Sequence, residues 1–191
     1  ITIAERAGPV QLAGGLIVLA DVSFADAPLC DQVIVTGGPG WRAQTENAAM
    51  QAFLRRCDPS VMASVCTGAM ILAAAGLVDN RTVTTRRHAV GAEAAAPLAD
   101  VGRFAPGTRP VVAAVVEDHG GVTGGGVSLA IDATLYLLGR IYGPQARDDE
   151  ERVEWQQDAG QRRQREAHRH YRDRDGVGER RDQRRLLKQR E

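Results

Sequence analysis

Short runs of apolar residues recur along the chain and are separated by stretches with helical periodicity. Runs of this length, several of them bounded by Gly, Asp or Pro, are typical of strands buried in a sheet. They predict strands at Leu16–Leu19, Gln32–Thr36, Val61–Val65 and Thr82–Thr85, and a hairpin-like pair at Val111–Glu117 and Gly121–Thr123.

The stretches between these strands predict four helices. The helices are expected over Thr45–Arg56, Thr67–Ala75, His88–Leu98 and Ser128–Tyr142. Thr45 is the expected N-cap of the first helix, whose inward-facing residues are Ala49, Phe53 and Leu54. Gly76 is placed to end the second helix in a left-handed cap. Strands that alternate with helices predict an α/β fold, with a parallel sheet covered by helices on both faces.

The composition narrows the class of protein. The chain has 191 residues, 43% of them apolar, and its 24 basic and 24 acidic residues give no net charge, which argues against a generally basic nucleic-acid binder. Ile1–Pro9 has no signal-peptide pattern, and no apolar run approaches the roughly 20 residues of a membrane-spanning helix. Three cysteines without a CxxC motif predict neither a disulfide framework nor a metal site. A reducing, cytoplasmic location is therefore expected, and no cofactor is predicted.

The last 45 residues differ sharply in composition from the rest. Arg147–Glu191 carries 14 of the basic and 12 of the acidic residues and few apolar ones. A segment this polar cannot bury enough apolar surface to offset the entropy of ordering it. We therefore expect one domain over residues 1–146, and over 147–191 a charged low-complexity tail that is disordered or a solvated helix. A basic nucleic-acid-binding arm and an out-of-frame reading of a GC-rich gene are the alternatives for this tail.

Cys66 stands where a predicted strand runs directly into a predicted helix. At such a turn the side chain projects above the carboxyl edge of the sheet, where ligands of open α/β folds bind. Peptide dipoles at the helix start favour a thiolate over a thiol, and the small Gly68 and Ala69 let the turn close tightly. The pattern predicts a nucleophile, the alternative being a buried, inert cysteine. Cys30 and Cys57 have no such placement and are expected to be structural.

The glycine-rich stretch Gly37-Gly38-Pro39-Gly40 follows the neighbouring predicted strand at the same edge. Glycines there allow the backbone to approach a ligand and to offer N–H groups to an oxyanion. Together with Cys66, the sequence predicts an oxyanion hole made by the amides of Gly38 and Thr67. A phosphate loop is not predicted, because no Gly-Lys-Ser/Thr follows.

Four segments carry a distinctive pattern of small residues around these positions. They are Val35–Gly40 (VTGGPG), Ala63–Ala69 (ASVCTGA), Ala74–Asp79 (AAGLVD) and Val122–Asp132 (VTGGGVSLAID), with Thr84-Thr85 between the last two. Taken together, they resemble the DJ-1/PfpI superfamily over nearly all of residues 5–143. The most similar branch is that of the isonitrile hydratases, which is shared with the ligand-sensing domains of AraC-type regulators.

The resemblance implies a flavodoxin-like, class I glutamine amidotransferase-like fold, frequent homodimerisation and a cysteine at the strand–helix elbow. It places Gly37, Gly40, His88 and Gly125 as candidates for binding a small-molecule substrate or effector, beside Cys66, Thr67 and Gly38 as candidates for catalysis. No membrane partner is implied, and nucleic acid is not an expected partner of this domain.

Three departures from the family pattern limit what it implies. Protease-like members have a histidine directly after the nucleophile, where this chain has Thr67, so a peptidase is not expected. In the hydratase branch a histidine follows the paired threonines, whereas here Arg86 and Arg87 come before His88. The family also begins with a strand–helix–strand unit that carries an acid working with the cysteine, and this first unit is expected to be missing here.

Two further groups of polar residues are expected to be structural. Asp132 lies in the first turn of the last predicted helix, where an acid complements the helix dipole. Glu117, Asp118 and His119 are adjacent on a strand and its turn, so they do not converge on one point and are expected to form a solvated hairpin.

Two classes of function follow from the sequence. The first is a cysteine-dependent hydratase, in which Cys66 attacks a small electrophile such as an isonitrile while the Gly38 and Thr67 amides stabilise the developing charge. The second is a non-catalytic domain that senses a small molecule in the same pocket.

Overall fold

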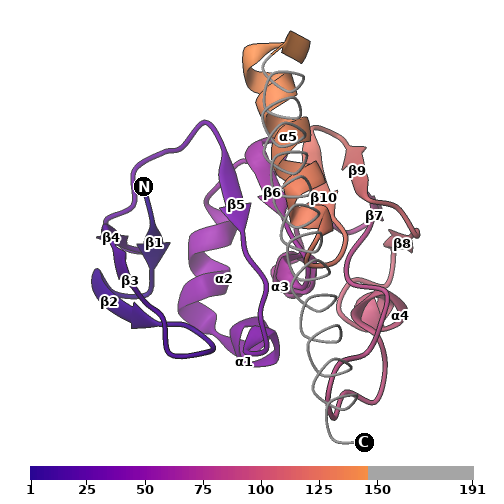
Figure 1. The fold of residues 1–191 in the computed structure, drawn as a ribbon, viewed down its shortest axis with the longest axis horizontal. Coiled ribbons are helices and arrows are strands. Elements are labelled where there is room, and N and C mark those ends of the chain that lie inside the picture. Colours follow the sequence, from indigo (N-terminus) through magenta and orange to yellow (C-terminus); the bar gives the residue numbers. More distant parts are fainter. Residues whose placement is uncertain (146–191) are drawn as a thin grey trace, which may run out of the picture. The chain divides into compact units, whose positions relative to one another are not determined.

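A four-stranded sheet in the order β5-β6-β10-β9 forms the centre of the fold (Figure 1). The strands β5 (Val33–Val35), β6 (Met62–Ser64) and β10 (Gly121–Gly124) are parallel, and β9 (Val115–Asp118) pairs antiparallel with β10. The register places Ile34 and Val122 on either side of Ala63. The carboxyl ends of β5 and β6 therefore reach the same edge of the sheet, as the sequence predicts.

The structure, a computed structural model, describes residues 1–145. The chain divides into two units, Ile1–Leu137 and Leu138–Glu191, and the central sheet lies in the first. Of the second unit, residues 138–145 are described. The predicted tail at 147–191 lies outside the described residues. None of the described helices is long and apolar enough to cross a membrane.

Three two-stranded ladders accompany the central sheet. The parallel pairs are β1 (Ile3–Ala4) with β4 (Val22–Ser23) and β7 (Thr82–Val83) with β8 (Arg109–Pro110), and the antiparallel pair is β2 (Gly8–Gln11) with β3 (Ile17–Ala20). The helices are α1 (Trp41–Glu46), α2 (Ala48–Arg55), α3 (Gly68–Ala74), α4 (Pro97–Asp100) and α5 (Leu129–Tyr142), with 3₁₀ turns η1 (Pro59–Val61) and η2 (Val101–Arg103).

Side chains on the two faces of the central sheet belong to two apolar clusters. Because successive residues of a strand point to opposite faces, Met62 and Ala63 enter different clusters. The larger cluster joins β5 and β6 to α2 and α3 through Val33, Val35, Met62, Leu54, Met70 and Leu72. The smaller one joins β6 and β10 to α5 through Ala63, Val122 and Leu137. Helices thus cover both faces, which confirms the predicted fold class.

The end of α3 is the predicted left-handed cap. Gly76 has φ +76°, its N–H donates to the carbonyl of Ala73 at 3.0 Å, and the N–H of Leu77 donates to the carbonyl of Leu72 at 3.0 Å. These two bonds form a Schellman motif, which satisfies carbonyls at the helix end.

The predicted helix at Thr45–Arg56 is interrupted by a cap within it. Asn47 ends α1 and begins α2, since its side chain accepts a hydrogen bond from the N–H of Met50 at 3.0 Å. The predictions that Thr45 is the N-cap and that Ala49 faces inward are wrong, because this break starts a new helix with a different buried face. Thr45 lies within α1, and Ala49 is exposed. Phe53 and Leu54 are buried as predicted.

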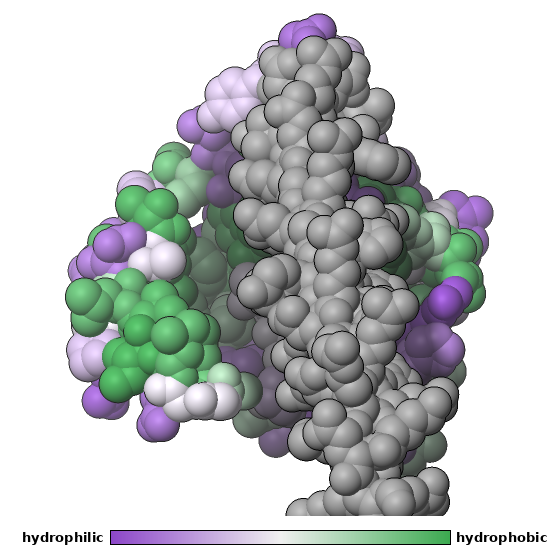
Figure 2. Space-filling model, viewed as in Figure 1, coloured by the Kyte–Doolittle hydropathy of each residue, from purple (hydrophilic) through white to green (hydrophobic). Residues whose placement is uncertain are grey.

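Two other elements also differ from the prediction. Leu16–Leu19 falls in a hairpin rather than in a buried strand, and Ile17 and Leu19 remain 62% and 68% exposed. Figure 2 shows hydrophobic residues gathered on the surface on the side of this hairpin. The segment from His88 to Ala96 is not helical, because the carboxylate of Glu93 binds groups outside that segment as well as the N–H of Val90.

The predicted hairpin is present as β9 and β10, but β9 begins at Val115 and not at Val111, whose N–H donates instead to the carbonyl of Val83 at 2.9 Å. His119 and Gly120 connect the strands with φ of +50° and +79°, as expected for a two-residue turn that matches the twist of a hairpin. The carboxylate of Asp118 accepts a hydrogen bond from the N–H of Thr82 at 2.7 Å, which lowers the pKa of Asp118. Asp118 therefore joins β9 to β7, and within residues 1–145 no three His, Cys, Asp or Glu side chains are grouped to hold a metal ion.

The start of α3 approaches β5 so closely that a side chain does not fit between them. A Cβ at Gly68 would lie 2.1 Å from the carbonyl oxygen of Val35. We therefore expect Gly68→Ala to lower the free energy of unfolding by about 2–3 kcal/mol, because the backbone must move to accept the methyl group. The measurement is chemical denaturation, with Gly102→Ala as the control. Gly102 is exposed with no atom within 4 Å of an added Cβ, so its replacement should change stability by less than about 1 kcal/mol. Equal effects of the two substitutions would contradict this packing argument.

Candidate functional site

Cys66 lies between the end of β6 and the start of α3 in a conformation that non-glycine residues rarely adopt. Its φ is +53°, in the left-handed region. The carbonyl oxygen of Cys66 accepts a hydrogen bond from the hydroxyl of Thr85 at 2.6 Å, and Thr85 is buried. A residue held in this region costs about 1–3 kcal/mol and persists only where its surroundings fix it. The elbow is therefore a constrained turn, as the sequence predicts for a strand that runs into a helix.

The segment Thr84–Thr85 connects this elbow to the neighbouring strands. The N–H of Thr84 donates to the hydroxyl oxygen of Thr123 on β10 at 2.9 Å. The hydroxyl of Thr84 donates to the carbonyl of Ala113 at 3.0 Å. Thr85 is thus held by a buried network, and its hydroxyl has a fixed position from which to bind the carbonyl of Cys66.

The glycine loop after β5 lies against the elbow. The N–H of Gly38 donates to the hydroxyl oxygen of Thr67 at 3.0 Å. A Cβ at Gly37 would lie 2.5 Å from that oxygen and 2.6 Å from the nitrogen of Thr67. The structure therefore brings Gly37 and Gly38 together with the residue that follows Cys66, and only a glycine fits at position 37.

The two amides predicted to form an oxyanion hole differ in their hydrogen bonding. The Gly38 N–H already has an acceptor in the Thr67 hydroxyl, so an oxyanion would have to replace that bond. The Thr67 N–H makes no hydrogen bond to any of the residues that the structure describes. Of the pair, the amide of Thr67 is the one without an acceptor among the described residues, but Thr67 is buried and Gly37 lies against its nitrogen.

The other predicted ligand-binding residues have separate surroundings. Gly40 precedes α1. Gly125 is buried, its N–H donates to the carbonyl of Ala114 at 2.8 Å, and a Cβ there would lie 2.6 Å from a methyl carbon of Leu129. His88 is exposed, and its Nε2 accepts a hydrogen bond from Arg87 at 3.0 Å. The hydrogen bonds of Gly125 and His88 do not reach the elbow, and a role for these residues in binding stays a prediction.

Sequence reasoning missed a cluster built around Glu93. Its carboxylate accepts hydrogen bonds from Arg86 at 2.6 and 2.7 Å, from the indole N–H of Trp41 at 3.0 Å and from the N–H of Val90 at 2.9 Å. Arg86 directly follows Thr85, and Trp41 directly follows the glycine loop. The cluster therefore connects the two segments that form the elbow's surroundings. Only the position of Arg86 beside the paired threonines signalled it, because Glu93 falls in a stretch that was expected to be helical.

The three cysteines have different surroundings. Burial raises the pKa of the Cys57 thiol, whose sulfur lies 3.5 Å from the carbonyl oxygen of Phe53. The sulfur of Cys30 lies 3.4 Å from the carbonyl oxygen of Pro28. Cys66 is half-buried, and its sulfur makes no hydrogen bond to the described residues. The thiol at the elbow is thus the one that no local acceptor engages.

A flavodoxin-like sheet with a cysteine at a constrained strand–helix elbow defines the class of protein. The model of the DJ-1/PfpI family matches residues 1–138, and the chain belongs to this family. Isonitrile hydratase from Pseudomonas putida is 32% identical over 137 residues, which are 71% of this chain and 56% of that protein. An uncharacterised protein from Streptomyces lividans is 32% identical over 85 residues, which are 44% of this chain and 60% of that protein. The chain thus spans somewhat more than half the length of these relatives.

Solved structures of the same family have the same fold. A DJ-1 superfamily protein from Salmonella typhimurium superposes with a TM-score of 0.63 at 26% identity, over 78% of both chains. A ThiJ/PfpI family protein from Pseudomonas syringae gives 0.60 at 25% identity, over 78% of this chain and 61% of that one. An AraC family transcriptional regulator from Pseudomonas putida gives 0.58 at 21% identity, over 79% and 78%, and shows likeness of fold alone.

The Glu93 cluster predicts a pH-dependent contribution to stability. The hydrogen bond from Arg86, followed by those from Trp41 and Val90, lowers the pKa of Glu93 from its ordinary value of 4.5 to about 2. A carboxylate with a lowered pKa stabilises the fold above about pH 4.5 and loses this effect as the pH falls towards 2. We expect Glu93→Gln to lower the free energy of unfolding by about 2 kcal/mol at pH 7, and the difference from wild type to shrink between pH 4.5 and 2.

The measurement is urea denaturation at a series of pH values. Glu46→Gln is the matched control, because Glu46 is exposed on α1. A difference between wild type and Glu93→Gln that stays constant over this range, or a Glu46→Gln variant that reproduces it, would show that the Glu93 carboxylate is not what fixes the segment.

Proposed function

We propose that Cys66 is the nucleophile of a site that binds a small electrophilic molecule. The proposed reaction is the hydration of an isonitrile. The observation that carries the proposal is the constrained turn at Cys66, whose carbonyl is bound by Thr85 while its sulfur has no partner in residues 1–145. A nucleophile presented on a strained strand-to-helix turn is exposed above the edge of the sheet. The 32% identity to isonitrile hydratase supports the choice of electrophile.

The proposed reaction starts at the isonitrile carbon. The sulfur of Cys66 forms a bond to that carbon, and the proton that the thiol gives up goes to the same carbon, which gives a thioimidate in which the C≡N bond has become a C=N bond. Water then adds to the same carbon and the C–S bond breaks, which releases an N-substituted formamide and returns the thiol. The N–H of Thr67, which has no acceptor among the described residues, is the amide that we expect to stabilise negative charge as the first bond forms.

Proton transfer is the step for which the described residues supply the fewest suitable groups. No carboxylate or histidine side chain in residues 1–145 is hydrogen-bonded to Cys66, Thr67 or Gly38. General acid–base help is typically worth about 10²–10⁴ in rate. We therefore expect the covalent adduct to form on this 191-residue chain and to be hydrated slowly.

The same features favour a second function, that of a sensor which binds its ligand without turnover. The Gly38 amide is occupied by the Thr67 hydroxyl, and no acid is bound to the elbow within the described part of the chain. Such a domain would bind a small molecule reversibly, with no product. A homodimer and a cytoplasmic location remain parts of this proposal.

Intact-mass spectrometry after incubation with cyclohexyl isonitrile tests the proposal. We expect an added mass of one isonitrile that is absent from Cys66→Ser and retained in Cys57→Ser, with formamide released far below the rates of about 1–10³ per second typical of enzymes. Formamide release at those rates would contradict the expectation of slow hydration. A chain that forms neither adduct nor formamide, or whose adduct survives in Cys66→Ser, would overturn the assignment of the nucleophile.

A further inference from the structure

A cavity of about 410 Å³ lies beside the glycine loop. Three segments of the chain line it, and the polar and aromatic residues among them are Trp41, Arg42, Glu93, Asp100 and Arg103. The lining begins at Pro39, the residue after Gly38, but it includes neither Cys66 nor Thr67. The cavity is therefore separate from the site of the elbow thiol, although the two share the glycine loop as a neighbour.

Two arginines share one buried carboxylate at this cavity. The Asp100 side chain is 6% exposed, and its Oδ1 accepts a hydrogen bond from Nη1 of Arg103 at 3.2 Å. Its Oδ2 lies 3.8 Å from Nη2 of Arg42. Each carboxylate oxygen thus faces one guanidinium group. Because both arginines bind the same carboxylate, their guanidinium groups lie close enough together to contact one small ligand.

Arg42 is also held from a second direction. Its guanidinium carbon lies 4.3 Å from the centre of the Trp41 ring, which is the geometry of a cation–π contact. Trp41 is buried and its indole N–H donates to Glu93 at 3.0 Å, so the ring itself is fixed. The guanidinium of Arg42 is therefore positioned before a ligand arrives, which lowers the entropic cost of binding.

The cavity has more hydrogen-bond donors and more positive charge than its own carboxylates use. Within residues 1–145, Arg42 and Arg103 make no hydrogen bond or ion pair other than those to Asp100, and both side chains reach solvent. The other acid of the lining is Glu93, whose two oxygens each accept two hydrogen bonds already. With Arg86, which binds Glu93, three guanidinium groups face two carboxylates.

The lining favours a small organic carboxylate among possible ligands. The parallel N–H groups of a guanidinium match the two oxygens of a carboxylate, and a surplus of one positive charge suits a monoanion. The wall beside Glu93 consists of small apolar side chains, those of Ala92, Ala94 and Ala95. These methyl groups offer contacts to an apolar substituent of the ligand.

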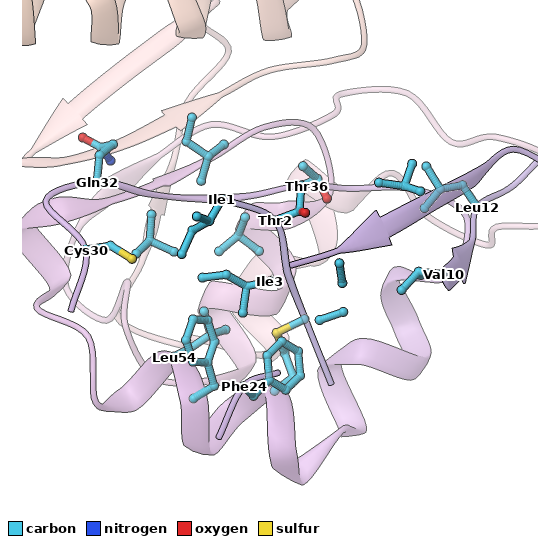
Figure 3. A pocket seen from close by; sticks show the side chains of 18 residues that line it. Ile1, Thr2, Ile3, Val10, Leu12, Phe24, Cys30, Gln32, Thr36 and Leu54 are labelled. Carbon is cyan, nitrogen blue, oxygen red and sulfur yellow. The ribbon is translucent and has the colours of Figure 1, made fainter. Parts of the chain in front are cut away.

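An apolar groove elsewhere in the molecule lacks these features. Ile3, Phe24 and Leu54 are among its lining residues, and no Asp, Glu, Lys, Arg or His side chain contributes to it (Figure 3). An anion would lose its hydration there without gaining a partner. A carboxylate therefore gains more from the cavity beside the glycine loop.

We propose that this cavity binds a small monocarboxylate, whose oxygens accept hydrogen bonds from Arg42 and Arg103 while its apolar part contacts the alanine wall. Asp100 positions both arginines and does not itself bind the ligand. Since Trp41 and Arg42 directly follow the glycine loop, occupation of the cavity also steadies the loop that lies against Thr67. The ligand is thus an effector of the elbow site and not its substrate.

The probe is cyclohexanecarboxylate, titrated into the full chain by calorimetry at constant ionic strength, with cyclohexanecarboxamide as the uncharged control. We expect saturable binding of the carboxylate at one site and an affinity for the amide that is lower by about tenfold, because hydrogen bonds to a charged acceptor are stronger. The place of binding is read from the emission of Trp41 in Trp155→Phe, which removes the second of the two tryptophans. The emission should change along the same binding curve.

Variants of the chain test the two arginines. Arg42→Gln and Arg103→Gln each remove one charge, and each should weaken binding of the carboxylate by about fivefold or more. Arg6→Gln is the matched control, because Arg6 is exposed and does not line the cavity. Cys66→Ser should bind the carboxylate as tightly as wild type.

Three results would overturn the proposal. The first is an absence of saturable binding, or equal affinities for the carboxylate and the amide. The second is an unchanged affinity in Arg103→Gln, which decides the matter even if Arg42→Gln does not fold, since Arg103 is the more exposed of the two side chains. The third is loss of binding in a folded Cys66→Ser, which would place the carboxylate at the elbow.

Discussion

The hydrogen bond from the Thr85 hydroxyl to the Cys66 carbonyl is the interaction on which the candidate site depends. Cys66 has a φ of +53°, a conformation that is unfavourable for a residue with a Cβ. A hydrogen bond of 2.6 Å from a buried hydroxyl contributes about 1 kcal/mol, which is similar to the lower limit of that backbone strain. Without it, the carbonyl would be left without this partner, and the left-handed peptide at Cys66 would be held less firmly. The direction in which the thiol points therefore depends on a residue in a different segment of the chain.

The glycines around the elbow have a steric role that is as important as their capacity to donate hydrogen bonds. Gly68 lies against the Val35 carbonyl and Gly37 lies against Thr67, so β5, the glycine loop and α3 meet with backbone directly on backbone. This contact is what allows the N–H of Gly38 to reach the hydroxyl of Thr67. The Glu93 cluster connects the segment after Thr85 to the segment after the glycine loop, since it joins Arg86 to Trp41. Among residues 1–145, these contacts leave the sulfur of Cys66 and the N–H of Thr67 without a hydrogen-bond partner.

The sequence was sufficient to predict the parts of this arrangement that depend on local patterns. Apolar runs identified β5, β6 and the hairpin β9–β10, and the small residues around Cys66 identified the elbow, because burial and tight turns restrict which side chains fit. The break at Asn47 was missed, since a cap inside a helical pattern is visible only when the side chain's hydrogen bond to Met50 is known. The Glu93 cluster was missed for a similar reason. Its three partners lie at separations of 3, 7 and 52 residues, and only the tertiary fold brings them to one carboxylate.

The central claim is that the constrained elbow makes Cys66 the reactive thiol of the protein. Competitive labelling with a limiting amount of iodoacetamide at neutral pH, followed by peptide mapping, tests it in wild type, Thr85→Val and Thr85→Ser. We predict that Cys66 is labelled first in wild type and that Cys57 is slower, because burial raises the pKa of the Cys57 thiol. Loss of the hydroxyl in Thr85→Val should slow labelling of Cys66 by about tenfold, equivalent to about 1.4 kcal/mol, whereas Thr85→Ser retains it. Faster labelling of Cys30 or Cys57, or an unchanged rate in a folded Thr85→Val, would contradict the account.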